Sequence, residues 1–126
     1  MLKTLTKSLI GATAALTIAG TSLTHAEEQA PVLLVQFQLD AEDPSGQALT
    51  AFFDKILPGT ISDEGNQSAQ YFVSKEDPSQ ILLSEEWDSQ EDFDAYLNWR
   101  IERGDFGTLQ SLLDAEPVVT FFERKA

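Results

Sequence analysis

Four apolar segments along the chain have the length and composition of β-strands. The run "VLLVQFQL" at 32–39 alternates in its later half, which is typical of a buried strand. The segments at 69–75 and 80–87 are separated by the turn sequence "EDPS", and together they predict an antiparallel hairpin. A last strand is predicted at 117–124, where Pro117 is tolerated because it stands at the start.

A helix is predicted between the first two strands. Asp43 is suited to cap it, and Pro44 is suited to its first position, where the missing N–H of proline costs nothing. The pair Pro58-Gly59 should end the helix. Between these limits apolar residues recur at helical spacing: Leu49, Phe52, Phe53 and Ile56.

A second helix is predicted after the hairpin. It should run from about residue 90 to Gly104, with Ser89 as its cap and Asp92 three residues further on. A short further helical stretch is predicted at 105–114.

The order β-α-β-β-α-β predicts an α+β, ferredoxin-like fold, in which a four-stranded antiparallel sheet carries both helices on one face. The strands at 32–39 and 117–124 are, however, apolar on both sides. Because a sheet face that is left to water should be polar, the second face should also be covered. The simplest cover is a second subunit, so the sequence predicts a homodimer.

The first 26 residues have the three-part pattern of a secretory signal peptide. A lysine-containing start, "MLKTLTK", is followed by the uncharged apolar run "SLIGATAALTIAGTSL" and by the small residues Thr24 and Ala26. The alternative is a membrane anchor, but a spanning helix needs roughly 20 predominantly apolar residues. We therefore expect cleavage, a mature domain at 27–126, a periplasmic or secreted location, and no membrane association afterwards.

Charge narrows the range of partners. Residues 27–126 contain 21 acidic and six basic side chains, which gives this part a formal charge of −15. Such a surface repels nucleic acid and anionic lipid. We therefore expect no nucleic-acid partner.

The absent residue types narrow the chemistry. The chain has no cysteine, and its single histidine, His25, falls within the predicted signal peptide. The usual zinc, copper, iron–sulfur and non-haem iron ligand sets therefore cannot form in residues 27–126. Ser–His and Cys–His nucleophile pairs are excluded for the same reason. The sequence predicts no metal site and no cofactor.

An arginine lies near the centre of the apolar stripe of the second helix. On a helical wheel this stripe consists of Phe93, Tyr96, Leu97, Arg100 and Ile101. Trp99 and Arg103 share one edge of the same face. Because a guanidinium keeps its charge, Arg100 must reach a partner. It either snorkels or pairs with an acidic residue, or it faces a ligand beside Tyr96 and Trp99, where a planar, oxygenated or anionic molecule would fit.

Glu85 raises a similar question on the strand at 80–87. It alternates onto the same face as Leu83 and Trp87, so a carboxylate is placed among apolar neighbours. It should therefore pair with an arginine, for which Arg100 is suited, or have a raised pKa. A polarising or basic role in a pocket and a structural ion pair both stay open.

The segment "SEEWDSQEDFDAYLNWR" resembles the motif of the antibiotic biosynthesis monooxygenase family. Glu85 and Trp87 match its strand end, and "DFDAYL" matches its helix, with Tyr96 where the family commonly has His. The closing "SLLDAEPVVTFFE" is similar to the family's last helix and strand. The resemblance covers most of residues 32–124.

This resemblance implies a dimeric α/β barrel in which two sheets pack face to face. It also implies a small monooxygenase that oxidises quinol-like or phenolic aromatics with O₂ and without metal or flavin. Our first hypothesis gives catalytic roles to Glu85, Tyr96 and Arg100. The residues expected to bind the aromatic substrate are Trp87, Trp99 and Arg103. The alternative is a non-catalytic dimeric module of the cell envelope that binds a small aromatic molecule or has a structural role.

Overall fold

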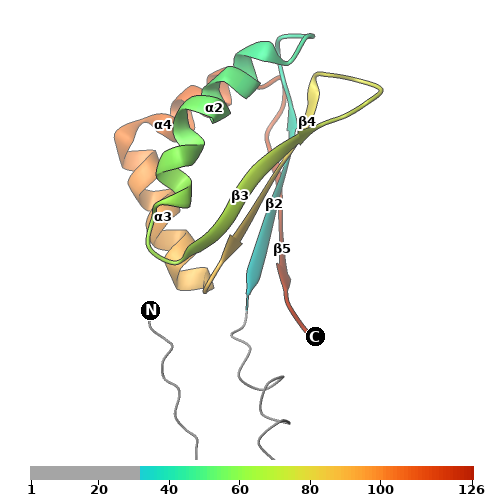
Figure 1. The fold of residues 1–126 in the computed structure, drawn as a ribbon. Helices are drawn as coiled ribbons and strands as arrows, with labels where there is room; N and C mark the ends of the chain where they lie inside the picture. Colours follow the sequence, from blue (N-terminus) through green and yellow to red (C-terminus); the bar gives the residue numbers. More distant parts are fainter. Residues whose placement is uncertain (1–31) are drawn as a thin grey trace, which may run out of the picture. The chain divides into compact units, whose positions relative to one another are not determined.

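The computed structural model describes residues 32–126 (Figure 1). The predicted signal peptide at 1–26 lies outside the described residues, so its cleavage and the export of the protein stay predictions. Within residues 32–126, no helix has the length and hydrophobicity that a membrane span requires.

One antiparallel sheet contains all the strands of the described part. Its strands are β2 (Leu33–Asp40), β3 (Asn66–Val73), β4 (Gln80–Trp87) and β5 (Val118–Glu123). Their order across the sheet is β3-β4-β2-β5, so the first and third strands form its centre. This is the ferredoxin-like order that the sequence predicts.

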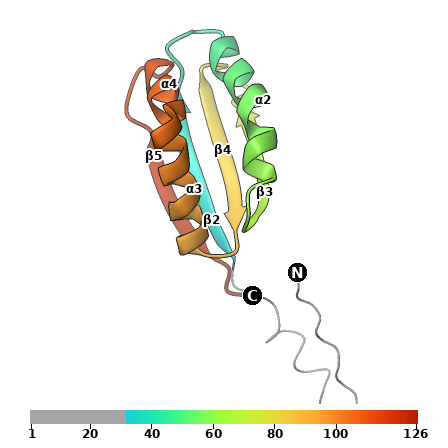
Figure 2. The same ribbon diagram turned by 90° about the vertical axis from the view of Figure 1, so that its left-hand side faces the viewer.

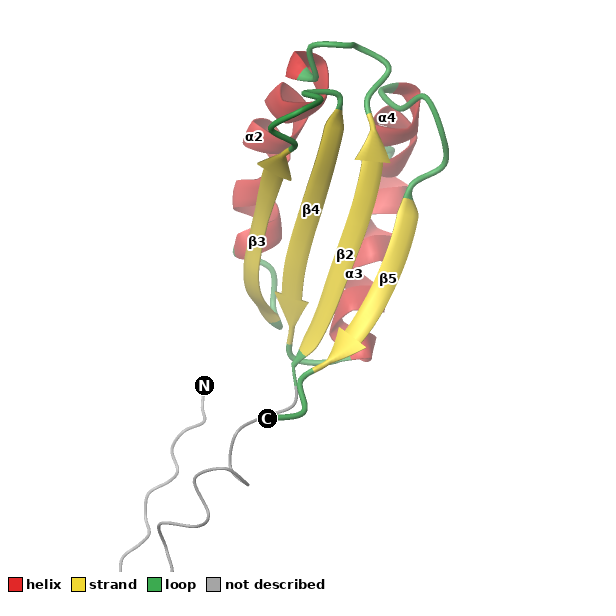
Figure 3. Ribbon diagram, turned by 90° about the vertical axis from the view of Figure 1, so that its right-hand side faces the viewer, coloured by secondary structure: helices red, strands yellow, loops and turns green. Residues whose placement is uncertain are grey.

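Three helices cover one face of this sheet, and the other face carries none (Figures 2 and 3). They are α2 (Gln47–Ile61), α3 (Gln90–Arg103) and α4 (Asp105–Ser111). Helix α2 lies on the β3 side of the sheet, while α3 and α4 lie on the β5 side. The predicted α+β class is confirmed.

The start of α3 is confirmed at the predicted cap. The Ser89 hydroxyl oxygen accepts a hydrogen bond from the backbone N–H of Asp92 at 3.1 Å. The helix ends at Gly104, whose φ of 89° is accessible to glycine at little cost. These two residues fix the entry and exit of the helix that carries Tyr96 and Arg100.

The start of α2 differs from the prediction. The helix begins at Gln47, because Gly46 adopts a left-handed conformation with a φ of 73° and interrupts the chain before it. Asp43 does not cap the first turn from the expected position. Its carboxylate instead accepts the backbone N–H groups of Ser45 at 3.0 Å and Ala48 at 3.3 Å.

The end of α2 also differs, because the helix continues through Pro58 to Ile61. A proline inside a helix removes one backbone donor. The last turn is nevertheless held in place because Leu57 and Thr60 are buried. The expected stop at Pro58 is therefore wrong, and the extra turn carries Thr60 into the candidate site.

Two other boundaries shift. Strand β3 begins at Asn66, before the predicted start at residue 69, because Asn66 pairs with Trp87 beside a β-bulge. Helix α4 is shorter than the predicted stretch at 105–114.

The core lies between the inner face of the sheet and the helices. Its most deeply buried large side chains come from β2, β4, α2 and α3: Val35, Leu39, Leu49, Phe53, Trp87 and Phe93. Two charged residues are buried with them, Glu85 and Arg100. The core is thus apolar except for these two residues and the buried Thr60 of α2.

The outer face of the sheet is mixed in character. Leu34 and Leu82 on the central strands are half-buried, while Phe72, Val118 and Phe122 on the outer strands are 50%, 56% and 50% exposed. Glutamine, serine and threonine side chains and the charged Glu86 separate them. The face is less apolar than the sequence pattern suggested, but it leaves large hydrophobic side chains in contact with water.

Candidate functional site

A small cavity of about 40 Å³, here called the inner cavity, lies between the sheet and the helices. Its wall is mostly apolar and includes Phe37 and Leu83 from the sheet. Glu85, Tyr96 and Arg100 also line it and supply polar groups. Three of the predicted site residues are therefore brought to one place.

Glu85 reaches the inner cavity from β4 and is only 3% exposed. The indole Nε1–H of Trp87 donates a hydrogen bond to its Oε1 at 2.9 Å. Burial raises the pKa of Glu85 from 4.5 to about 7, although the hydrogen bond from Trp87 and the charge of Arg100 act in the opposite direction. The carboxyl group therefore changes its charge near neutral pH.

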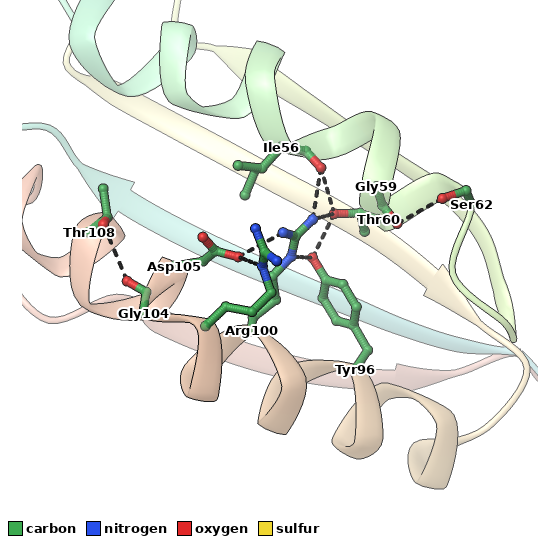
Figure 4. A network of polar contacts seen from close by, with 10 residues as sticks. Ile56, Gly59, Thr60, Ser62, Tyr96, Arg100, Gly104, Asp105 and Thr108 are labelled. Atoms are coloured by element: carbon green, nitrogen blue, oxygen red, sulfur yellow. Dashed lines mark hydrogen bonds and ion pairs between the residues drawn. The ribbon is translucent and has the colours of Figure 1, made fainter.

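Arg100 pairs with Asp105 at the start of α4, where Nη1 donates to Oδ2 at 2.8 Å (Figure 4). Among the described residues, no ion pair joins it to Glu85, so the suggested partnership of Glu85 and Arg100 is not formed. The turn at Gly104 brings Asp105 under the last turn of α3, which explains this choice of partner.

The other nitrogens of Arg100 are also engaged. Nε donates to the Tyr96 hydroxyl oxygen at 2.9 Å, and Nη2 donates to the Ile56 carbonyl at 2.9 Å. Thr60 completes the network, because its hydroxyl lies 2.6 Å from that of Tyr96. Burial acts to lower the pKa of Arg100, but its hydrogen bonds to Tyr96 and Asp105 outweigh this and raise the pKa. The guanidinium is thus a fixed, permanently charged junction between α2, α3 and α4.

Tyr96 is held as a neutral phenol. Burial raises its pKa, although hydrogen bonds from Thr60 and Arg100 act in the opposite direction. Its ring lies 4.9 Å from that of Trp87, which is fully buried and does not line the inner cavity. Trp87 therefore holds Glu85 by a hydrogen bond and packs against the ring of Tyr96, without contacting the inner cavity itself.

Trp99 and Arg103 lie elsewhere, on a surface groove of about 360 Å³ between α2 and the α3–α4 pair. We call it the outer groove. Its wall consists of Phe52, Lys55, Ile56, Gly59, Trp99, Arg100, Arg103, Asp105 and Thr108. Five of the six predicted site residues are thus divided between two places, while Trp87 lines neither. Arg100 and Asp105 line both places.

Sequence reasoning missed Thr60 and Asp105. Thr60 was missed because the helix was expected to end at Pro58. Asp105 follows Gly104, which ends α3. This glycine was the available signal that the chain turns back and brings the next residue near the end of the helix. Among residues 32–126, no cluster of three or more His, Cys, Asp or Glu side chains is placed to hold a metal ion.

Comparison with known proteins places this arrangement in a family. The sequence profile described as "Antibiotic biosynthesis monooxygenase" matches residues 32–100, which include Glu85, Tyr96 and Arg100. No match was found among curated proteins.

Solved structures share the fold. A conserved protein from Methanosarcina mazei Go1 superimposes with a TM-score of 0.69 at 18% identity, over 76% of this chain and 95% of that one. A Deinococcus radiodurans protein named as a candidate antibiotic biosynthesis monooxygenase gives 0.66 at 17% identity, over 75% and 93%. A structure named antibiotic biosynthesis monooxygenase gives 0.66 at 14% identity, over 75% and 99%. With the matched profile spanning more than half of its sequence, the chain belongs to the antibiotic biosynthesis monooxygenase family.

Proposed function

We propose that this protein is an exported, cofactor-independent monooxygenase that oxidises a small phenolic or quinol-like aromatic with O₂ at the inner cavity. Membership of the family supports the reaction class. The observation that carries the proposal is Glu85, a buried carboxyl group on an apolar cavity with a pKa of about 7.

Glu85 is the proposed base. A general base works best when its pKa lies near the working pH, since it must accept a proton and return it. The hydrogen bond from Trp87 holds one oxygen of the carboxyl group in place. Tyr96 is unsuited to this role, because burial raises its pKa.

Arg100 and Tyr96 stabilise the substrate anion in this proposal. The guanidinium is fixed by three partners before any substrate arrives, so its charge needs no reorganisation during the reaction. The Tyr96 hydroxyl is oriented by Arg100 and Thr60 and offers a polar contact for a phenolic oxygen.

Proton removal from an activated carbon of the aromatic substrate gives an anion that is itself the reductant of O₂. In a methylene-to-carbonyl oxidation, one oxygen atom enters the product and the other leaves as water with the two displaced hydrogens. The atoms balance without an external electron donor. This chemistry requires a base, a group that stabilises an anion and apolar surroundings, which Glu85, Arg100 with Tyr96, and the apolar wall of the inner cavity supply in this proposal.

The size of the inner cavity favours a second candidate function, a non-catalytic binding or structural module. About 40 Å³ is enough for a few water molecules but not for an aromatic ligand, since ligand pockets occupy roughly 300 Å³ or more. Catalysis therefore requires the apolar wall of the inner cavity to open while the Arg100 network stays in place. A purely structural module requires no such opening.

Oxygen uptake with a panel of hydroquinones and polycyclic phenols distinguishes these functions. We expect at least one compound to give O₂-dependent turnover. Glu85→Gln should lower the rate by about 100-fold or more, the usual contribution of a general base. Glu76→Gln, in the exposed turn between β3 and β4, is the matched control and should retain the rate. If no compound is turned over but some raise the melting temperature under nitrogen, the protein is a binding module.

We also propose that the protein is a homodimer whose two sheets pack through their outer faces. Family members are typically dimeric. The exposed side chains of Phe72, Val118 and Phe122 support this face as the interface, because large hydrophobic side chains grouped on one surface favour association.

Molar mass by light scattering checks the assembly. Phe122→Asp should give the mass of one chain, because it places a charge on the proposed interface. Ile101→Asp is the matched control, since Ile101 is similarly exposed at 48% but lies on α3. It should give the mass of two chains, as should the unmodified protein. A monomeric unmodified protein, or equal effects of the two variants, would contradict this interface.

A further inference from the structure

The outer groove gathers basic side chains in a strongly acidic protein. The whole chain has a formal charge of −13, and residues 32–126 contain six lysines and arginines. Three of these six, Lys55, Arg100 and Arg103, line the outer groove, whereas Asp105 is its single acidic residue. The groove is therefore a local positive region on a negative surface, which concentrates anions.

Two of these three cations have donors available for a ligand. Lys55 takes part in no ion pair within the described residues. Arg103 is 54% exposed at its side chain and donates to Asp105 through Nε at 3.0 Å, and its terminal nitrogens have no hydrogen-bond partner among the described residues. Arg100, by contrast, is fully engaged. Lys55 and Arg103 lie on α2 and α3, on opposite walls of the groove.

An aromatic wall lies beside these donors. Trp99 is 43% exposed, and the guanidinium carbons of Arg100 and Arg103 lie 4.7 and 5.1 Å from its ring centroid. Such stacking holds the indole and both guanidiniums in a defined arrangement. Phe52 provides an apolar side chain on the α2 wall. A ligand that fits this surface needs a planar apolar body and a negative charge.

We propose that the outer groove binds a planar aromatic carboxylate, with the carboxylate between Lys55 and Arg103 and the ring against Trp99 and Phe52. An arginine fork and a lysine ammonium are suited to a carboxylate, and a volume of about 360 Å³ accommodates one or two fused rings. This site is separate from the inner cavity, because Lys55, Trp99 and Arg103 do not line that cavity. It goes beyond the proposed oxidation and does not depend on it.

Calorimetric titration with 2-naphthoate, and with neutral 2-naphthamide as its isosteric control, measures the role of charge. We expect 2-naphthoate to bind, 2-naphthamide to bind at least about 10-fold more weakly, and added salt to weaken only the former. Lys55→Gln and Arg103→Gln should each weaken 2-naphthoate by about 5-fold, the loss of one charge-assisted hydrogen bond at an exposed site.

Lys75→Gln is the matched control, because it removes the same charge from the turn between β3 and β4. It should leave 2-naphthoate binding unchanged. Equal loss in Lys75→Gln and Lys55→Gln would mean that net charge alone attracts the ligand, and the proposal would fail. Absence of binding, or equal binding of acid and amide, would overturn it as well.

The two tryptophans locate the bound ligand. In a ¹H–¹⁵N NMR spectrum each indole N–H gives one signal, and Trp99→Phe identifies which signal belongs to Trp99. We expect 2-naphthoate to shift the Trp99 signal and to leave that of Trp87, which is buried beside Glu85, unchanged. A shift of the Trp87 signal alone would place the ligand in the inner cavity and refute the groove site. Neither result depends on O₂ turnover. The groove site can therefore be refuted while the proposed oxidation stands, and the oxidation can be refuted while the groove site stands.

Discussion

In the unmodified protein the free energy of unfolding is expected to fall as the pH rises from about 5 to 8, and in the Glu85→Gln variant this fall is expected to be absent. Burial raises the pKa of Glu85 from 4.5 to about 7 in the folded protein. Below pH 4.5 the carboxyl group is protonated in both states. Between pH 4.5 and about 7 the unfolded chain loses this proton while the folded protein keeps it, so stability is lost, and above about 7 both states are ionised and the loss ends. The difference is on the order of 3 kcal/mol.

Urea denaturation at several pH values measures this effect. Glutamine keeps an oxygen that can accept the Trp87 Nε1–H, so the comparison removes the titration while preserving that contact. Glu76→Gln is again the matched control, and its curve should run parallel to that of the unmodified protein. If the Glu85→Gln curve is also parallel, Glu85 titrates normally, and the argument for it as a base near neutral pH is lost.

The fold could be predicted because its signals are local. The alternation of 80–87, the serine before α3 and the glycine after it each depend on a few neighbouring residues. The start of α2 was missed because Gly46 adopts a left-handed conformation, and its end was missed because a tertiary contact outweighed a local rule. Pro58 is a strong signal for a helix end, but the burial of Thr60 against Tyr96 keeps the helix going for another turn.

The candidate site was predicted in part, for a related reason. A helical wheel identifies Arg100 as a charge among apolar neighbours, but it cannot identify the partner. Glu85 was a reasonable choice because it lies on the facing strand. Asp105 is the actual partner because the left-handed Gly104 turns the chain back beneath Arg100. The separation of Trp99 from the inner cavity likewise depends on where α2 lies, which the sequence of α3 does not encode.

Arg100 connects the two candidate sites, and this changes how its role should be tested. It lines the inner cavity and stacks on Trp99 in the outer groove, while its nitrogens bind groups on α2, α3 and α4. A substitution at Arg100 therefore disturbs both sites and the packing of the helices. Loss of activity in such a variant would not by itself identify Arg100 as a catalytic residue, so its structural contribution has to be measured first.

Arg100→Met is expected to lower the free energy of unfolding by about 3–5 kcal/mol, the cost of removing one partner from a buried, hydrogen-bonded ion pair. The thioether fills part of the volume, but the Ile56 carbonyl loses the Arg100 donor and Asp105 keeps only the exposed Arg103 as its partner. Adding Asp105→Asn should recover part of this loss, because the second change removes a carboxylate that has lost its buried partner. Urea denaturation of the two single variants and the double variant measures the coupling.

Arg103→Met is the control that separates burial from charge. Both arginines donate to the same oxygen of Asp105, but the side chain of Arg103 is 54% exposed and that of Arg100 is 8% exposed. An exposed ion pair contributes about 1 kcal/mol or less, so Arg103→Met should have a small effect. If the two variants were equally destabilised, the buried network would contribute little to folding. An effect of Arg100→Met as small as that expected for Arg103→Met would favour the ligand-facing role for Arg100. A charge held in the core without a structural benefit is otherwise costly.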